Sequence, residues 1–414
     1  MLKPGISILI TLAVPTFGSS QAGTKPAKEL IEVRAVVTDR QGKPVDGLAA
    51  DDFLLKEDTF QPALDSFSIG KIESDPGRQP SLKMEPVTGT GSAASRNTAA
   101  PASPRAVVLM VDTPGISPGG MESVRAALLR FVDEQLTHQD LVALMTTAGK
   151  PGVTGEFAGD RTGLRDGIRK LRSGRARTES FLTPALCGKV SRRDPEAVRL
   201  ATRIIEAEEY TAGSVVMGGG GDTQIEAASK CMMLLLETAT RRRAVTSSIR
   251  AATGRLAAVA GQRIIALFSE GFSMIAPGGE FAIADVRPAM SAAARSGVMI
   301  YCFDATVALD TKPIDMGNLH LSSEMNNAVR DLQHGIALLA NQTGGEAFFS
   351  VDSLGNCLQK MLDDNRIYYR FAYSPPEARA PQAYRSITVS VKNHPEYRVR
   401  AQKGYVFADL RRSR

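Results

Sequence analysis

The chain has 414 residues, of which 43% are hydrophobic and 23% are charged, so it is neither a disordered nor a collagen-like polypeptide. Lysine and arginine total 50 against 44 acidic residues, and this mild excess of positive charge does not predict a nucleic-acid partner. The chain has no tryptophan and only four histidines and four cysteines, which leaves little for base stacking, metal binding or nucleophilic catalysis. Composition therefore favours a protein that is not an enzyme.

The first 22 residues have the features of a secretory signal peptide. Lys3 carries a positive charge, residues 6–14 are largely apolar, and Ser20 and Ala22 place small side chains before a cleavage site. The apolar stretch is too short to cross a bilayer, which takes about 20 residues. We therefore expect cleavage near Ala22, export to the periplasm or the cell exterior, and no membrane span.

Export permits disulfide bonds. Cys187 and Cys231 lie in the same central region, and we predict that they are paired. Cys302 falls inside the apolar run 298–303, which is typical of a buried strand, so we expect a buried free thiol there. Cys357 falls in a predicted helix without a predicted partner, and no two cysteines have the CxxC spacing of zinc or redox sites.

After the predicted signal peptide, residues 23–70 are expected to form an N-terminal β segment. Apolar and polar side chains alternate over 29–39, which predicts a half-exposed strand, and a second short element includes 53–55. Residues 71–104 are rich in Ser, Gly, Pro, Ala and Thr and nearly free of large apolar side chains, so we expect a flexible linker.

From residue 105 onward, apolar runs alternate with helical patterns. Uninterrupted apolar runs suit strands that are buried on both faces of a parallel sheet. These runs are 106–111, 141–145, 264–268 and 298–303. Between them the apolar side chains have helical spacing, first over 124–136. The alternation predicts an α/β domain over 105–366 with a doubly wound, mostly parallel sheet.

Two regions depart from this alternation. Residues 173–258 run from a loop rich in Ser, Arg and Thr into helical patterns over 194–209 and 225–258, which we interpret as a helical insertion. Residues 367–414 contain alternating β segments. Because β segments occur on both sides of the α/β region, we expect the N- and C-terminal strands to form one small β domain that the α/β domain interrupts.

Polar side chains follow the predicted parallel strands, at the sheet edge where open α/β folds bind ligands. These strand-end residues are Asp112, Ser269, Glu270 and Asp304. Together with Thr113 and Ser117, Asp112 gives one loop a carboxylate and two hydroxyls, the hard oxygens that Mg²⁺ or Ca²⁺ prefers. Alternatively, Asp112 caps the turn or the following helix and binds nothing.

The sequence resembles a von Willebrand factor type A domain. The matching features are Asp112 after the first apolar strand, the helical residues 128–131 and the Phe-Ser-Glu-Gly of 268–271. More narrowly, the mature chain resembles the VWFA-related family described from Acidobacteria. The matching segments keep the order of that family and are 36–39, 42–48, 52–58, 343–348, 368–375 and 403–405. The resemblance implies a fold more specifically than it implies an activity.

Type A domains hold a cation in a metal-dependent adhesion site, built from Asp-x-Ser-x-Ser, a Thr from a second loop and an Asp after the fourth strand. In this chain Asp112 matches, but Pro114 and Ile116 stand at the two serine positions. Ser269 or Glu270 stands in place of the last Asp. The candidates for the Thr are Thr178 and Thr183.

The resemblance therefore implies a degenerate adhesion site. Its candidate metal ligands are Asp112, Thr113, Ser117 and Glu270. Apart from Glu270, this set offers one carboxylate, that of Asp112, and displaced hydroxyls. Such a set makes a weak site for Mg²⁺, because this ion gives up its water reluctantly. We expect no cofactor, or at most weakly bound Mg²⁺ or Ca²⁺.

Three functions are consistent with these features, and we favour the first. It is an exported, adhesion-type module that binds a protein partner of unknown identity and has no catalytic residue. The alternative is a hydrolase of unknown substrate that uses the strand-end Asp and Ser residues, although the chain has neither HExxH nor GxSxG. The third is binding to an anionic surface through the arginines 241–243, Arg250 and Arg255. A run of arginines on a helix is more commonly a solvated face. Glu237, four residues before Arg241, favours this solvated face.

The insertion also contains a dense apolar stretch at 232–236. We expect this stretch either to be buried against the α/β domain or to be available to a partner helix.

Overall fold

A computed structural model describes residues 30–72, 104–137, 140–148, 153–158, 161–174, 181–211, 220–306, 322–349, 353–375 and 383–406. The predicted signal peptide and nearly all of the predicted linker lie outside these residues. Across the described ranges, none of the helices combines the length and the apolar character that crossing a bilayer requires.

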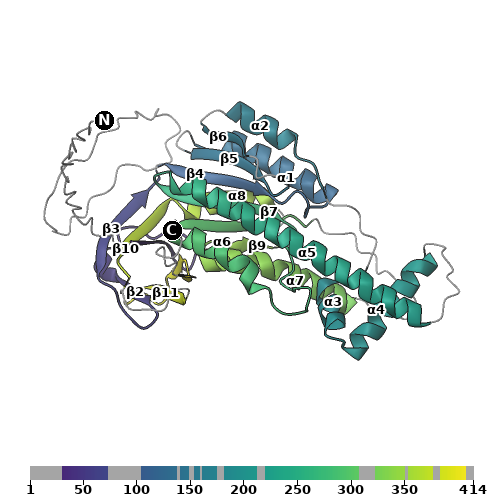
Figure 1. The fold of residues 1–414 in the computed structure, drawn as a ribbon. Helices are drawn as coiled ribbons and strands as arrows, with labels where there is room; N and C mark the ends of the chain where they lie inside the picture. Colours follow the sequence, from purple (N-terminus) through teal and green to yellow (C-terminus); the bar gives the residue numbers. More distant parts are fainter. Residues whose placement is uncertain are drawn as a thin grey trace, which may run out of the picture.

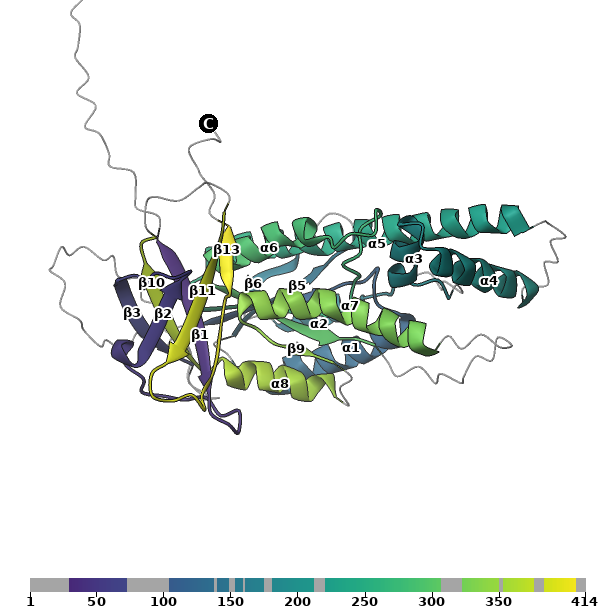
Figure 2. The same cartoon turned by 90° about the horizontal axis from the view of Figure 1, so that it is seen from below.

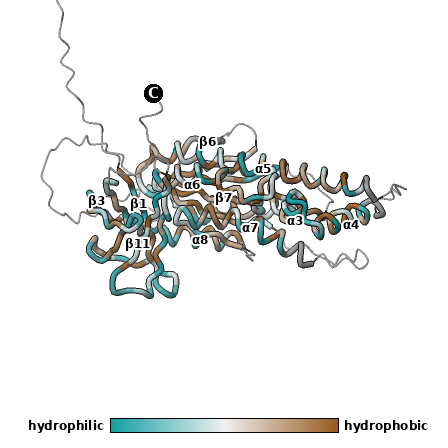
Figure 3. Tube along the Cα trace, turned by 60° about the horizontal axis from the view of Figure 1, so that its bottom comes forward, coloured by the Kyte–Doolittle hydropathy of each residue, from teal (hydrophilic) through white to brown (hydrophobic). Residues whose placement is uncertain are grey.

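The centre of the molecule is a six-stranded sheet in the order β6-β5-β4-β7-β8-β9 (Figure 1). Five neighbouring strands run parallel and β6 runs antiparallel at one edge. The strands are β4 (Arg105–Val111), β5 (Asp140–Thr146), β6 (Val153–Ala158), β7 (Gln262–Ser269), β8 (Val298–Asp304) and β9 (Ala347–Phe348). The central strands β4 and β8 are buried at every residue, and Figure 3 shows hydrophobic residues, drawn in brown, around β7, which lies between them in the sheet. The predicted α/β fold with a mostly parallel sheet is confirmed.

Helices cover both faces of this sheet. One face packs against α1 (Pro118–Arg130), α2 (Arg161–Arg169) and α8 (Leu354–Asp364), and α1 continues into a π-helical turn, η2 (Phe131–Gln135). The other face packs against α6 (Ile283–Arg295), α7 (Ser322–Thr343) and the C-terminal half of α5 (Gly220–Ala257). The helical spacing of apolar side chains in the sequence thus corresponds to helix faces that are buried on the sheet.

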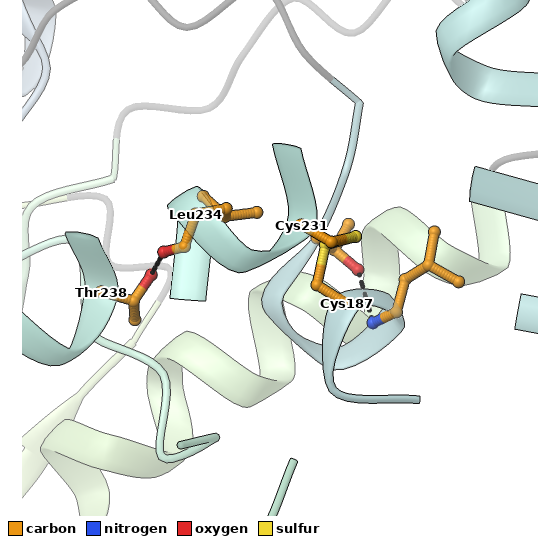
Figure 4. The surroundings of a disulfide bond; sticks show 6 residues. Cys187, Cys231, Leu234 and Thr238 are labelled. Carbon is orange, nitrogen blue, oxygen red and sulfur yellow. Dashed lines mark hydrogen bonds between the residues drawn. A yellow bond between two sulfur atoms is a disulfide. The ribbon is translucent and has the colours of Figure 1, made fainter. Parts of the chain in front are cut away.

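The helical insertion forms an arm that extends past the carboxyl ends of the parallel strands (Figures 1 and 2). It consists of α3 (Pro184–Ser191), α4 (Pro195–Thr211) and the N-terminal half of α5, which is 38 residues long. Its own core includes Leu186, Ile204 and Leu235. The predicted disulfide is confirmed: Cys187 on α3 and Cys231 on α5 are bonded, with 4.9 Å between their Cα atoms (Figure 4).

The two remaining cysteines are buried free thiols. Cys302 lies within β8, as predicted, and burial raises its pKa far above that of an exposed thiol. Cys357 lies on α8. Burial also raises the pKa of Cys357, so neither thiol is readily ionised.

Strands from both ends of the chain form two antiparallel sheets, which confirms the predicted small β domain. One sheet has the order β12-β1-β10-β3 and the other has the order β13-β11-β2. The N-terminal elements are β1 (Ile31–Thr38), η1 (Ala50–Asp52), β2 (Phe53–Glu57) and β3 (Leu64–Lys71). The C-terminal elements are β10 (Ile367–Tyr373), β11 (Tyr384–Val391), β12 (Arg398–Ala401) and β13 (Gly404–Val406). N- and C-terminal strands pair directly, as in β1 with β10 and β2 with β11.

The first strand differs from its prediction as a half-exposed strand. In β1 every residue except Glu32 is buried. Its apolar residues of one face, such as Val33 and Ala35, pack in the core of the β domain, while Val36 packs in the core of the α/β domain. The alternation predicted a strand with two unlike faces correctly, but the second face contacts the neighbouring domain instead of water.

Buried arginines join the two domains. Arg34 of β1 donates hydrogen bonds to the carbonyl of Gly261 and to Gln262, at the start of β7. Arg400 of β12 is ion-paired with Glu346 and with Asp364 at the end of α8. Burial by itself would raise the pKa of Glu346, but Lys360 and Arg400 lower it below its ordinary value. The β domain is therefore fastened to the amino ends of the parallel strands by paired charges.

We expect Arg400→Ala to lower the free energy of unfolding by about 2–3 kcal/mol, because Glu346 and the buried Asp364 then keep only the partly exposed Lys360 as a counter-charge. The side chain of Arg400 is 9% exposed, whereas that of Arg398, 3.9 Å from Glu346, is 65% exposed. Arg398→Ala is therefore the matched control, with a change of no more than about 0.5 kcal/mol. Urea unfolding of both variants is the measurement, and equal losses would contradict the role given to Arg400.

Candidate functional site

Polar side chains gather where the parallel strands end, as the sequence predicted. Asp112 follows β4, Ser269 ends β7 and Asp304 ends β8. The strands are in register, with Val111 opposite Phe268 and Ser269 opposite Asp304, so these residues reach the same edge. This carboxyl edge is the candidate functional site.

The carboxylate of Asp112 is the centre of the edge and is only 1% exposed. Its Oδ1 accepts a hydrogen bond of 2.8 Å from the hydroxyl of Thr147, and its Oδ2 accepts one of 2.8 Å from the hydroxyl of Ser269. The guanidinium of Arg241 donates two more to Oδ2, from Nε at 3.1 Å and from Nη2 at 2.9 Å. Asp112 therefore has both a counter-charge and hydrogen-bond donors within the protein.

Arg241 comes from α5 and connects the two loops beside Asp112. Its Nη2 also donates to the carbonyl oxygens of Gly115 at 3.1 Å and Gly271 at 2.6 Å. A Cβ added at Gly115 would lie 1.9 Å from this nitrogen, so the close approach of the guanidinium requires glycine there. The side chain of Arg241 is 18% exposed, which places a largely buried positive charge at the carboxyl edge.

The other predicted ligands have structural contacts of their own. Ser117 is the N-cap of α1, and its hydroxyl accepts a hydrogen bond of 3.2 Å from the backbone nitrogen of Gly120. Glu270 accepts one of 2.7 Å from the backbone nitrogen of Ser117. Thr113 is buried in the same loop. Glu270 and Ser117 thus lie together near Asp112, and their role as metal ligands stays a prediction.

Of the two threonines proposed for the second loop, the described one, Thr183, has another role. Thr183 is the N-cap of α3 and accepts a hydrogen bond of 3.2 Å from the backbone nitrogen of Leu186, and Thr178 lies outside the described residues. Thr147, which follows β5, makes the contact with Asp112 instead. Asp304 accepts hydrogen bonds from Thr306 and from Gln333, the latter at 3.0 Å. Among the described residues, no three His, Cys, Asp or Glu side chains are grouped so that they could hold a metal ion.

Sequence reasoning missed Thr147 and Arg241. Thr147 could have been found, because it is the second residue after an apolar run and so lies at a predicted strand end, as Asp112 does. The interpretation of the basic run as a solvated face is wrong for two of its three arginines: Arg241 pairs with Asp112, and Arg242 is 0% exposed and pairs with Asp285 at 2.7 Å. Only Arg243, at 68%, is exposed. The reason is that α5 continues from the arm back onto the sheet, so this part of the helix faces internal carboxylates.

The described histidines do not contact the carboxyl edge. His334 packs against the ring of Phe281, and His394 stacks on Tyr397 and contacts Glu396 at 2.9 Å. His138 and His320 lie outside the described residues. Within the described part of the chain, the hydroxyl of Ser269 therefore faces a carboxylate and an arginine but no histidine.

No protein-family profile and no curated protein matches the chain. Among the solved structures that are similar to it, two match over 63% of its length. One is an aerotolerance-related membrane protein from Bacteroides fragilis, of which 98% is covered at 12% identity with a TM-score of 0.32. The other is the conserved hypothetical protein BatB from Bacteroides thetaiotaomicron, of which 96% is covered at 15% identity with a TM-score of 0.30. Likenesses of this order carry no argument about what the chain does.

The pair of Asp112 and Arg241 can be tested by a double-mutant cycle. Asp112→Asn should lower the free energy of unfolding by about 3 kcal/mol, because it leaves a mostly buried guanidinium without its counter-charge. Arg241→Met combined with Asp112→Asn should cost less than the sum of the single changes, with a coupling of at least about 1 kcal/mol. Chemical unfolding of the three variants is the measurement, and strictly additive losses would contradict the pairing.

Proposed function

We propose that the chain is an exported, non-catalytic protein-binding module in which Arg241 takes the place that a cation has in a type A adhesion site. Export rests on the signal-like residues 1–22, the absence of catalysis rests on the carboxyl edge, and protein binding rests on an apolar stripe of the arm described below. A guanidinium brings one positive charge and a planar set of donors that fits a carboxylate. It needs no dissolved ion, so the carboxyl edge keeps its arrangement without Mg²⁺ or Ca²⁺.

The contacts of Asp112 support independence from a cation. Its two oxygens accept four hydrogen bonds from Thr147, Ser269 and Arg241. A divalent ion that approached Asp112 would have to displace the guanidinium, which is held at the same time by two backbone carbonyls. The repulsion between two cations in a poorly solvated site opposes binding of the ion.

The hydrolase alternative lacks an activated nucleophile. Ser269 is fully buried, and its hydroxyl donates to Asp112 and accepts from the backbone nitrogen of Gly271 at 3.1 Å. An attacking serine needs a base that takes its proton and a position open to substrate. Asp112, saturated by Arg241, does not offer the first, and the burial of Ser269 removes the second.

The observation that carries the protein-binding function is an apolar stripe on the arm, made of Ile225, Met232, Met233 and Leu236. Their exposed fractions are 69%, 42%, 68% and 46%. Their spacing places them along one side of α5. Large apolar side chains grouped on a surface mark protein contacts, and methionines adapt to the shape of a partner. The stripe is suited to the apolar face of a partner helix.

Titration with Mg²⁺ and Mn²⁺ tests the role given to Arg241. The wild-type protein should release no heat of binding up to millimolar ion. Arg241→Ala should bind weakly, because it frees the Asp112 carboxylate, and Asp112→Asn in that background should abolish the binding. Arg243→Ala, two residues further along α5 and at an exposed side chain, is the control. Ion binding to the wild type that Asp112→Asn removes would instead establish metal-dependent adhesion.

Substitution of the stripe tests protein binding. Met233→Ser with Leu236→Ser should abolish the retention of a specific envelope protein by the immobilised chain, because most of the exposed apolar contact is lost. Val329→Ser removes an isolated exposed side chain of α7, 45% exposed, and should change nothing. The retained protein must then bind in purified form with the same dependence on the stripe. The same retention by the stripe variant as by the wild type, or no retention by the wild type, would argue against this function.

A further inference from the structure

A groove of about 440 Å³ lies between the C-terminal turns of α5 and α6, away from the carboxyl edge. Arg250 of α5 and Arg295 of α6 line its two sides. Arg250 is nine residues beyond Arg241, which is about 13 Å along the helix. The groove is therefore a surface feature separate from the Asp112 site, close to the β domain.

The lining of the groove is positively charged. It contains the two guanidinium groups, the hydroxyls of Ser247 and Ser296, and no carboxylate. The C-terminal ends of α5 and α6 contribute partial negative charges of roughly half a unit each, which is less than the two full charges of the arginines. Arg295 also donates a hydrogen bond of 3.0 Å to the carbonyl of Val406, which holds one guanidinium in position.

The hydroxyl of Thr253 is a buried polar group without a partner. Thr253 is 3% exposed, and within the described residues its Oγ1 has no hydrogen-bond partner. A threonine inside a helix ordinarily bonds a carbonyl one turn earlier, as Thr238 does with Leu234 at 2.7 Å (Figure 4). An unsatisfied buried hydroxyl destabilises a protein, and the Oγ1 of Thr253 is closed off from solvent, so it is a local cost in stability beside the groove and not a group that a ligand in the groove contacts.

Gly254 lines the same groove, and no close contact explains the absence of a side chain there. A Cβ added at Gly254 would meet nothing within 4 Å, and its backbone has no positive φ. Glycine inside a helix is less stable than alanine. Its effect at this position is to keep the groove open, together with the small side chains of Ala251 and Ala292.

We propose that this groove binds a phosphate group, with Arg250 and Arg295 paired to its oxygens and the hydroxyls of Ser247 and Ser296 beside them. Two guanidinium groups balance the two negative charges of a phosphate ester, and the hydroxyls supply further donors. The volume exceeds that of a phosphate, so the group is carried by a small organic molecule or by a lipid headgroup.

Calorimetry with glycerol 3-phosphate and flotation with phosphatidylglycerol vesicles distinguish these two sources. The source is the probe that binds the wild-type protein and loses tenfold or more in affinity with Arg250→Ala. Arg255→Ala, on the same helix but outside the lining, is the matched control and should bind as the wild type does. Failure of both probes to bind, equal loss in the control, or equal affinity for succinate would overturn the proposal.

Gly254→Leu tests the groove by its shape. Because it fills the groove without changing its charge, it should abolish binding of the phosphate probe with no loss of Tm. Thr253→Val removes the unsatisfied hydroxyl while keeping the shape of the side chain, so it is the control that should raise the Tm and leave the affinity unchanged. Unchanged affinity in Gly254→Leu would overturn the proposal.

Discussion

The ion pair between Arg241 and Asp112 is the interaction on which the site and the insertion both depend. The two residues are 129 positions apart in the chain: Arg241 belongs to the insertion, and Asp112 follows the central strand β4. A carboxylate that is 1% exposed is stable only with a nearby positive charge and a full set of hydrogen bonds. Because the charge and the hydrogen-bond acceptors of Asp112 must be matched from within the protein, α5 has to cross the carboxyl edge at Arg241. The same pairing leaves this carboxylate without a free oxygen for a cation or for catalysis.

Paired arginines recur wherever distant segments meet. Arg400 joins β12 to α8, Arg105 of β4 pairs with Asp140 of β5 at 2.9 Å, and Arg385 of β11 pairs with Glu57 of β2 at 2.9 Å. The guanidinium is suited to this use because it stays charged when buried and binds two oxygens at once. The fold thus relies on charge pairs between elements, in addition to the apolar cores within them.

One helix provides all three of the functional features considered for this protein. The first turns of α5 carry the apolar stripe and are braced by the disulfide between Cys187 and Cys231. Its middle supplies Arg241 to Asp112, and its last turns form one wall of the phosphate groove. Because a helix is stiff along its length, contacts at the arm and at the groove are held in a constant relation to the sheet. The arm and the β domain lie at opposite ends of the α/β domain (Figure 2).

By itself, the sequence determined the elements and their order: the apolar runs of the parallel strands, the helical insertion, the terminal β strands and the pairing of Cys187 with Cys231. These depend on periodicity and on short-range chemistry, which every residue carries with it. Only the tertiary structure decided that β1 is covered on both faces and that Arg241 and Arg242 are internal. Both outcomes depend on which distant surface each segment meets, and a charged side chain on a helix has the same local pattern whether it faces water or a buried carboxylate.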